Sequence, residues 1–404
     1  MKTTITFESD VLGTCFHPSD ATIIAACEIS GAVSLTSIGE DASERRFSSK
    51  YHKGSARCVE FGLDGKELFS GGEDKSLQIL DSATGKPILK KAKAHGEPIN
   101  CISAIAENMV VTGDDAGVVK IWDTRARKLV MKYEVNEDFI SDLTYVSHES
   151  TLLATSADGR LSVFDIRKKK PIKVSDNQED ELLSVTVLKN TKKAVVGSED
   201  GILSIFSWNN WGDCTDRIPG HPGAIESILK MDESRILTGC SDGKVRIVNI
   251  FPNKIVSSLR DHDVDLPIEQ LRINADATIV ASVSHEDKIR LWDVSDLGTE
   301  AGDGDSDDDD EFESDDAGSS GDESVPVAAA DDSDDADEAS EAEEPQDSKT
   351  HVVEAKIVVP KLPELSTGTA TKRESDQTEP TKKAKKVKKV MPNAKQTAYF
   401  GDLD

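Results

Sequence analysis

The sequence has few cysteines, few aromatic residues and no long apolar run. Its six cysteines are scattered through apolar stretches, and no two of them form a Cys-x-x-Cys pair. Zinc sites need clustered thiolate and imidazole ligands, and disulfide-stapled secreted domains are short and dense in cysteine. We therefore expect no metal site, no cofactor, and free thiols that are mostly buried in a reducing compartment.

Signals for membrane attachment and for catalysis are also missing. No apolar run approaches the roughly 20 residues of a membrane span, and residues 1–8 contain no apolar signal-peptide core. The sequence contains no glycine-rich phosphate loop, no nucleophile elbow and no His-Glu-x-x-His motif. These absences favour a soluble, intracellular protein that is not an enzyme.

The net charge of -28 is unevenly distributed along the chain. Residues 300–347 carry 23 acidic and no basic residues, whereas residues 348–404 carry 12 Lys or Arg against 7 acidic residues. The remainder has a net charge of about -10. Since RNA binding depends on basic groups that face phosphates, this mildly acidic balance argues against strong RNA binding by the first 297 residues.

What the sequence has in abundance is internal repetition. The stretch from His95 to Asp123 contains apolar runs at 99–105 and 109–112, a turn at 113–117, and a third run that ends in Trp122-Asp123. Three strands this short cannot bury their own apolar faces, so the unit has to pack against copies of itself. The final residue recurs every 42 to 44 residues, at Ser37, Asp81, Asp123, Asp165, Ser207, Asn249 and Asp293.

A period of about 40–45 residues that ends in Trp-Asp is typical of WD40 propeller blades, each with four strands. Seven ends predict an all-β, seven-bladed WD40 β-propeller over residues 1–297. The last repeat has no apolar run after Asp293, whereas residues 3–8 alternate like a strand and precede the first repeat. We expect this N-terminal strand to complete the last blade and close the ring.

The remaining residues are predicted to be a disordered C-terminal tail, because they have too little apolar surface to offset chain entropy. Residues 298–348 form an acidic linker, and residues 349–404 a basic tail. Its basic cluster fits a nuclear localisation signal read by an import receptor; a solvated charged segment and direct RNA contact are the alternatives. The residues concerned are Lys372, Arg373, Lys382, Lys383, Lys385, Lys386, Lys388 and Lys389.

Recurrent His, Ser or Thr, Asp and Trp residues could indicate acid–base chemistry, but they occur in more than one repeat. A catalytic set occurs once, whereas WD40 blades use these residue types as a buried hydrogen-bonded chain between strands. We therefore predict two structural tetrads. Their members are His95, Thr112, Asp115 and Trp122, and His262, Ser282, Asp287 and Trp292.

Two stretches are candidates for protein binding. Trp208 and Trp211 lie close together after the third strand of repeat five, where they either form a contact site or pack on a neighbouring blade. Residues 122–125 read Trp-Asp-Thr-Arg, and a weaker version stands at 164–167. In many WD40 proteins this W-D-x-R pattern, here with Asp123 and Arg125, marks docking to the adaptor of a cullin-RING ubiquitin ligase. It also arises by chance.

The whole chain resembles the WD-repeat protein 55 family, whose fungal members are called JIP-type WD-repeat proteins. The matching residues are Phe7 to Gly13, Phe16-His17-Pro18, Ser207 to Gly212, and Asp216 to Pro222 with the further candidate Arg217. The acidic linker, the basic stretch and the terminal residues Phe400 to Leu403 match as well. The last six residues, Tyr-Phe-Gly-Asp-Leu-Asp, depart from the two adjacent Phe of family members.

This resemblance implies a nuclear and nucleolar protein that acts in ribosomal RNA processing and large-subunit assembly. We expect a scaffold that holds ribosome assembly factors. The alternative is a substrate receptor of a cullin-RING ubiquitin ligase, which some family members resemble.

Overall fold

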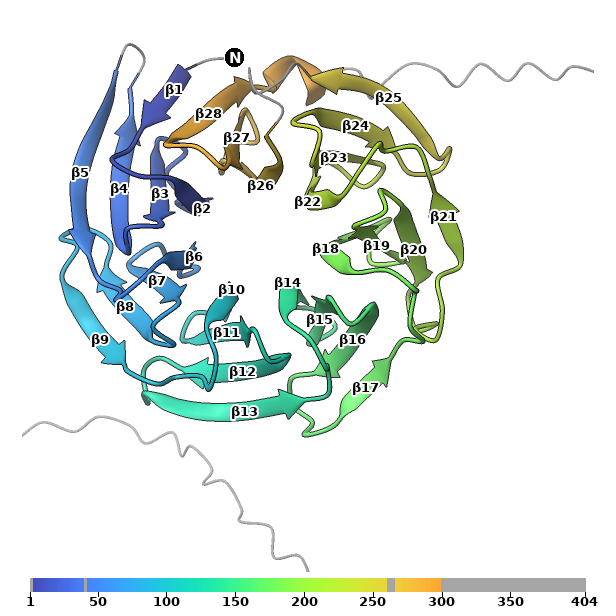
Figure 1. The fold of residues 1–404 in the computed structure, drawn as a ribbon, viewed down its shortest axis with the longest axis horizontal. Coiled ribbons are helices and arrows are strands. Elements are labelled where there is room, and N and C mark those ends of the chain that lie inside the picture. The colour runs from blue at the N-terminus through green and yellow to red at the C-terminus, as the bar shows by residue number, and fades with distance from the viewer. Residues whose placement is uncertain (1–2, 40–41, 260–265, 299–404) are drawn as a thin grey trace, which may run out of the picture. The chain divides into compact units, whose positions relative to one another are not determined.

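The computed structural model describes residues 3–39, 42–259 and 266–298. These residues form seven four-stranded antiparallel sheets, arranged as blades around a common axis (Figure 1). All of them belong to one compact unit, Met1–Glu311. The predicted all-β, seven-bladed propeller is confirmed. The predictions for the acidic linker beyond residue 298 and for the basic tail lie outside the described residues.

Each blade is a meander whose first strand lies nearest the axis (Figure 1). These innermost strands are β2 (Val11–Phe16), β6 (Ala56–Phe61), β10 (Ile99–Ala106), β14 (Ile140–Val146), β18 (Leu182–Leu188), β22 (Ile225–Lys230) and β26 (Ile268–Ile273). The second strands are β3 (Ile23–Glu28), β7 (Glu67–Gly72), β11 (Met109–Asp114), β15 (Thr151–Ser156), β19 (Lys193–Ser198), β23 (Arg235–Cys240) and β27 (Ile279–Ser284).

The third strands end at the residues that defined the repeat, except in blade 1, where the strand runs one residue further. They are β4 (Ala32–Ile38), β8 (Leu77–Asp81), β12 (Val118–Asp123), β16 (Arg160–Asp165), β20 (Leu203–Ser207), β24 (Val245–Asn249) and β28 (Lys288–Asp293). The outer strands are β5 (Ser43–Lys50), β9 (Pro87–Lys91), β13 (Lys128–Glu134), β17 (Pro171–Val174), β21 (Asp216–Ile218), β25 (Lys254–Leu259) and β1 (Thr3–Thr6). A short 3-10 helix, η1 (Ser295–Gly298), follows β28.

The N-terminal strand closes the ring, as predicted. β1 pairs antiparallel with β28, with Thr3 opposite Leu291 and Ile5 opposite Ile289. The side chain of Ile5 is buried in the cluster shared by blades 7 and 1. The two ends of the propeller sequence therefore belong to one sheet, and the edge of β28 is covered.

Apolar side chains fill the space between neighbouring blades. Between blades 4 and 5, for example, Val163 and Leu161 pack with Leu182 and Phe206, all fully buried. A single blade could not bury these faces, so the stacking inferred from the repeat provides the core. All six cysteines are free thiols. Among the described residues, no helix is long and apolar enough to cross a membrane.

Tight turns set the two faces of the disc. Turns between second and third strands, and connections from one blade to the next, lie on what we term the upper face. Loops between first and second strands, and between third and outer strands, lie on the lower face. In blade 3 the upper turn needs glycine, since Gly117 has a φ of 73° and an added Cβ would lie 2.5 Å from the carbonyl oxygen of Asn136. Other residues adopt such a φ only with strain.

Candidate functional site

The polar chain of blade 3 is a sealed structural network. His95 bonds through Nδ1 to Asp114 Oδ2 at 2.7 Å and through Nε2 to Thr112 Oγ1 at 2.6 Å, and Trp122 Nε1 donates to Thr112 at 2.9 Å. An ionised Asp114 only accepts, so Nδ1–H donates to it, and Nε2 then accepts from the Thr112 hydroxyl. All four residues are buried, which leaves no room for a substrate.

The predicted member Asp115 was wrong, and Asp114 takes its place. The register pairs Asp114 with Ile99, so that its carboxylate turns into the blade. Asp115 follows in the turn and accepts hydrogen bonds from Arg57 Nη1 at 3.0 Å and from Asn100 Nδ2 at 2.5 Å. Sequence alone could not separate two adjacent aspartates, because the choice depends on which one ends the strand.

Burial and hydrogen bonding shift the pKa values inside this network. Burial lowers the pKa of His95, which favours the neutral ring. For Asp114, burial acts to raise the pKa, but hydrogen bonds from His95 and from the backbone N–H of Val118 outweigh it and lower the pKa. The pair is therefore a neutral imidazole and a carboxylate.

Related networks occur in other blades. Of these, the sequence predicted only the one in blade 7. In blade 2, His52 contacts Asp74 at 2.8 Å and Ser70 at 2.9 Å, an arrangement whose signal was a His before the first strand and an Asp in the upper turn. In blade 6, His221 contacts Thr238 at 2.9 Å, while Cys240 stands at the register position of Asp114.

The second predicted tetrad is only partly covered by the described residues. Trp292 Nε1 donates to Ser282 Oγ at 2.8 Å, as a tetrad requires. His262 lies outside the described residues, so the predicted role of Asp287 beside it stays a prediction. The Asp287 carboxylate lies 3.9 Å from Lys288 Nζ in the upper turn of blade 7.

The tryptophan pair packs within the propeller. Trp211 is only 4% exposed and joins the core between blades 4 and 5, and Trp208 packs against it with its ring perpendicular at 4.8 Å. Of the two alternatives left open by the sequence, packing is the one observed. Arg217, on β21, is exposed and donates from Nη2 to Gln178 Oε1 at 3.4 Å.

The two W-D-x-R copies differ in what their arginines do. Asp123 accepts the backbone N–H of Ala126 at 2.6 Å, and Arg125 is exposed in the turn after β12. In the second copy Arg167 donates from Nε to Asp165 at 2.8 Å, and this bond holds the pKa of Asp165 far below its usual range. Phe400, Leu403 and the predicted import residues lie outside the described part of the chain.

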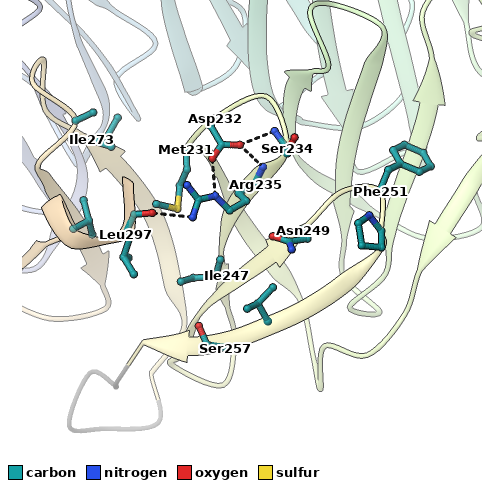
Figure 2. A pocket seen from close by; sticks show the side chains of 14 residues that line it. Met231, Asp232, Ser234, Arg235, Ile247, Asn249, Phe251, Ser257, Ile273 and Leu297 are labelled. Carbon is teal, nitrogen blue, oxygen red and sulfur yellow. Dashed lines mark hydrogen bonds and ion pairs between the residues drawn. The ribbon is translucent and has the colours of Figure 1, made fainter. Parts of the chain in front are cut away.

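A groove between blades 6 and 7 was not foreseen from the sequence. It has a volume of about 650 Å³ and opens on the lower face (Figure 2). Loops of both blades and the strand β25 build it, so no contiguous motif announces it. Its lining is mainly apolar and consists of Met231, Asp232, Ser234, Arg235, Ile247, Asn249, Phe251, Pro252, Val256, Ser257, Ile273, Ala277, Val294 and Leu297.

The polar groups of the groove are arranged in two ways. Arg235 is held in place, because its Nε donates to Asp232 at 2.6 Å and its Nη1 donates to the carbonyl oxygen of Leu297 at 2.8 Å (Figure 2). Asn249, by contrast, has a buried Oδ1 without a hydrogen-bond partner among the described residues. The exposed Val256 beside this mainly apolar lining suits an apolar peptide segment.

Three charged side chains, Glu60, Asp142 and Arg272, project from the innermost strands of blades 2, 4 and 7, and Arg272 affects the pKa values of the other two. Burial and the nearby Asp142 raise the pKa of Glu60 to about 7, against the lowering effect of Arg272. Burial also raises the pKa of Asp142, with Arg272 again acting to lower it. Among the described residues no group of three His, Cys, Asp or Glu side chains could hold a metal ion.

Comparison with known proteins places this fold in a family. The family model WDR55 matches residues 2–297, which is the whole propeller. WD repeat-containing protein 55 of Danio rerio is 46% identical over 295 residues, 72% of this chain and 76% of the relative. The Arabidopsis thaliana protein of the same name is 35% identical over 291 residues, 72% of this chain and 82% of the relative.

A fungal relative matches to a similar extent. WD repeat-containing protein JIP5 of Cryptococcus neoformans is 37% identical over 296 residues, 70% of this chain and 79% of the relative. The region that the family model matches, residues 2–297, contains the seven blades and the closing strand. The chain therefore belongs to the WD repeat-containing protein 55 family of WD40 β-propellers.

Proposed function

We propose that this protein is a non-catalytic scaffold for ribosome assembly factors, acting in ribosomal RNA processing and large-subunit assembly in the nucleolus. The observation that carries the proposal is the match of one family model to the entire propeller, together with the sequence features that resemble that family. The seven-bladed architecture supports a role that depends on the surface of the propeller.

The groove between blades 6 and 7 is the docking site that best fits this role. Val256 is 52% exposed at its edge, and the Oδ1 atom of Asn249 in its lining is buried without a hydrogen-bond partner among the described residues. An apolar anchor with a few polar contacts is the usual design of a peptide-binding site. Assembly factors with short apolar segments are therefore the expected partners.

Depletion and rescue test this function. Loss of the protein is expected to lower the free large-subunit peak on gradients and to accumulate precursor ribosomal RNA. Rescue with Val256→Asp, in the groove, should fail, whereas Val130→Asp, an equally exposed valine on β13, should rescue like the unchanged chain. Unchanged subunit levels and precursor RNA after depletion would exclude the proposed function.

Nuclear and nucleolar localisation is part of the proposal. The basic cluster at Lys382, Lys383, Lys385, Lys386, Lys388 and Lys389, with Lys372 and Arg373 upstream, supports import by a receptor. Replacing Lys385 and Lys386 by Gln in a fluorescent fusion should shift the protein to the cytoplasm. Nuclear retention of that variant would contradict the assignment.

The exposure of Arg125 supports the alternative function, a substrate receptor of a cullin-RING ubiquitin ligase. Arg125 is exposed and follows Trp122-Asp123, so it is available to an adaptor. The substitution Arg125→Ala should then abolish co-purification of the cullin-RING adaptor, whereas Arg127→Ala, an exposed arginine in the same turn, should not. Equal adaptor recovery with both variants, or none with the unchanged chain, rejects this alternative.

A further inference from the structure

The tertiary structure sorts charge onto the two faces of blades 3–5. Their upper turns, and the connections that leave these blades, contain ten carboxylates and no Lys or Arg. The carboxylates belong to Asp115, Glu137, Asp138, Asp158, Asp176, Glu179, Asp180, Glu181, Glu199 and Asp200. Acidic upper turns alternate along the sequence with basic lower loops. The net charge of about -10 for the propeller therefore does not reveal that the two kinds of charge lie on different faces.

The lower loops of the same blades are basic. Together with the strand residues that flank them, the lower loops of blades 3–5 carry ten basic residues against six acidic ones. The basic residues are Arg125, Arg127, Lys128, Arg167, Lys168, Lys169, Lys170, Lys189, Lys192 and Lys193. The acidic ones are Glu107, Asp123, Glu149, Asp165, Asp213 and Asp216; Asp123 is bonded to its own turn, and Asp165 is paired with Arg167 and Lys168. The two faces thus have opposite sign.

The loop from Lys189 to Thr191 is held in an unusual conformation. All three residues have positive φ, at 55°, 51° and 63°. Contacts from both neighbouring blades fix it, because Glu233 Oε2 accepts the backbone N–H of Asn190 at 2.7 Å and Thr191 Oγ1 lies 3.0 Å from His148 Nε2. A strained loop that its surroundings hold in place is a preorganised surface element.

An aromatic platform and a hollow adjoin this basic loop. Phe251 is 45% exposed, and Lys193 Nζ lies 5.2 Å from the centre of its ring. On the other side a hollow of about 570 Å³ is lined by Tyr145, His148 and Thr191, among others. A cation beside an exposed ring is the combination with which proteins hold a phosphate and stack a base.

We infer that the lower face of blades 3–5, extended to Phe251, binds single-stranded RNA. The basic loops face the phosphates, Phe251 stacks a base, and the hollow beside His148 receives another. An acidic peptide would satisfy the charges but would leave the aromatic platform unused. The inference deepens the proposed function, because it gives the scaffold direct contact with ribosomal RNA.

Binding is measured by fluorescence anisotropy with the full chain and a labelled oligouridine of about 20 nucleotides, over a salt series from about 50 to 200 mM. The variant combines Lys169→Gln, Lys170→Gln and Lys192→Gln, all exposed on the lower face. Its control combines Lys50→Gln, Lys53→Gln and Lys93→Gln, which are exposed elsewhere. Both sets remove three positive charges and leave the basic tail unchanged.

The lower-face variant is expected to bind oligouridine roughly tenfold to a hundredfold more weakly and to reduce the slope of log K against log salt by about 2. The control should stay within about twofold of the unchanged chain. Phe251→Ala should weaken oligouridine binding roughly tenfold and leave binding of heparin, which has no bases, unchanged.

Three outcomes overturn the inference. If the unchanged chain does not bind oligouridine, or if the lower-face variant keeps its affinity and salt slope, this face is not an RNA site and any binding resides in the basic tail. If polyglutamate binds as tightly as oligouridine and Phe251→Ala affects neither, the partner is an acidic protein. If an oligonucleotide of deoxyuridine binds equally well, the site binds single-stranded nucleic acid without distinguishing RNA from DNA. RNA binding without a depletion phenotype would reject the proposed function and leave this inference intact.

Discussion

At the scale of single residues, the most informative result is the choice between Asp114 and Asp115. One carboxylate is buried against His95, and its neighbour lies in a surface cluster with Arg57 and Asn100. Removing a buried partner leaves the other polar group unsatisfied, whereas a half-exposed ion pair contributes little. The two aspartates should therefore differ strongly in their effect on stability.

Asp114→Ala is expected to lower the free energy of unfolding by about 1–3 kcal/mol, because His95 Nδ1 loses its acceptor. Asp115→Ala should cost less than about 1 kcal/mol, since its ion pair with Arg57 is open to water. Urea unfolding of both variants provides the comparison. An equal effect of the two substitutions would contradict the assignment of Asp114 to the network.

Glu60 makes stability depend on pH in a direction that follows from its raised pKa. In the folded chain its pKa is about 7, against 4.5 for an ordinary glutamate. Below pH 4.5 Glu60 is protonated in both the folded and the unfolded chain, so its titration does not change the free energy of unfolding. As pH rises to about 7 the unfolded chain ionises first, and the folded state loses stability relative to it.

Glu60→Gln should remove this loss. We expect about 1–2 kcal/mol of added stability near pH 8 and no gain near pH 4, a value below the full linkage energy because water near the axis screens the charge. Thermal unfolding at both pH values measures the difference. The exposed Glu107→Gln serves as control, and a gain for Glu60→Gln that is the same at both pH values would reject the explanation.

At the scale of elements, the closing strand β1 stands out. Its four residues tie the beginning of the propeller sequence to β28, and Ile5 supplies the apolar contact in the cluster between blades 7 and 1. Ring closure replaces an open sheet edge by a paired one. A short strand thus has an effect on the stability of all seven blades.

Ile5→Ala should lower the free energy of unfolding by about 2–4 kcal/mol, the usual loss for a large aliphatic side chain in a core. Thr6→Ala, at an exposed position of the same strand, should change it by less than about 0.5 kcal/mol. Calorimetry of both variants gives these values. If Ile5→Ala unfolds like the unchanged chain, β1 does not lock the ring.

At the scale of the whole molecule, carboxylates crowd the upper face. Burial, followed by the negative charges of neighbours such as Glu199, raises the pKa of Glu181. Burial, and then Glu269, does the same for Glu226. The stability linked to these groups is present at low pH and is lost as pH rises through their raised pKa values.

Salt should partly restore that stability above those pKa values. We expect the melting temperature near pH 7.5 to rise as ionic strength increases from about 20 to 300 mM, because screening weakens the repulsion. The double variant Glu181→Gln/Glu226→Gln should show a smaller rise than Glu107→Gln/Glu149→Gln, which replaces two exposed glutamates of the lower loops. Equal rises in the two variants would show that these carboxylates do not repel one another.

The sequence by itself determined the repeating architecture. Blade number, the ends of the third strands and the closing strand all follow from a period of 42 to 44 residues and from alternating apolar residues, which are local properties of the chain. The family likewise rests on local motifs. These predictions were confirmed because each blade uses the same local rule.

Tertiary structure decided which side chains meet. It placed Asp114 rather than Asp115 in the network, buried Trp211, assembled the groove around Asn249, and separated the charges of alternate loops onto opposite faces. Each of these features joins residues from different blades or depends on the side of a strand from which a side chain projects. Composition averages over both faces, so a propeller sequence of mildly acidic net charge still folds with an acidic upper face and a basic lower face in blades 3–5.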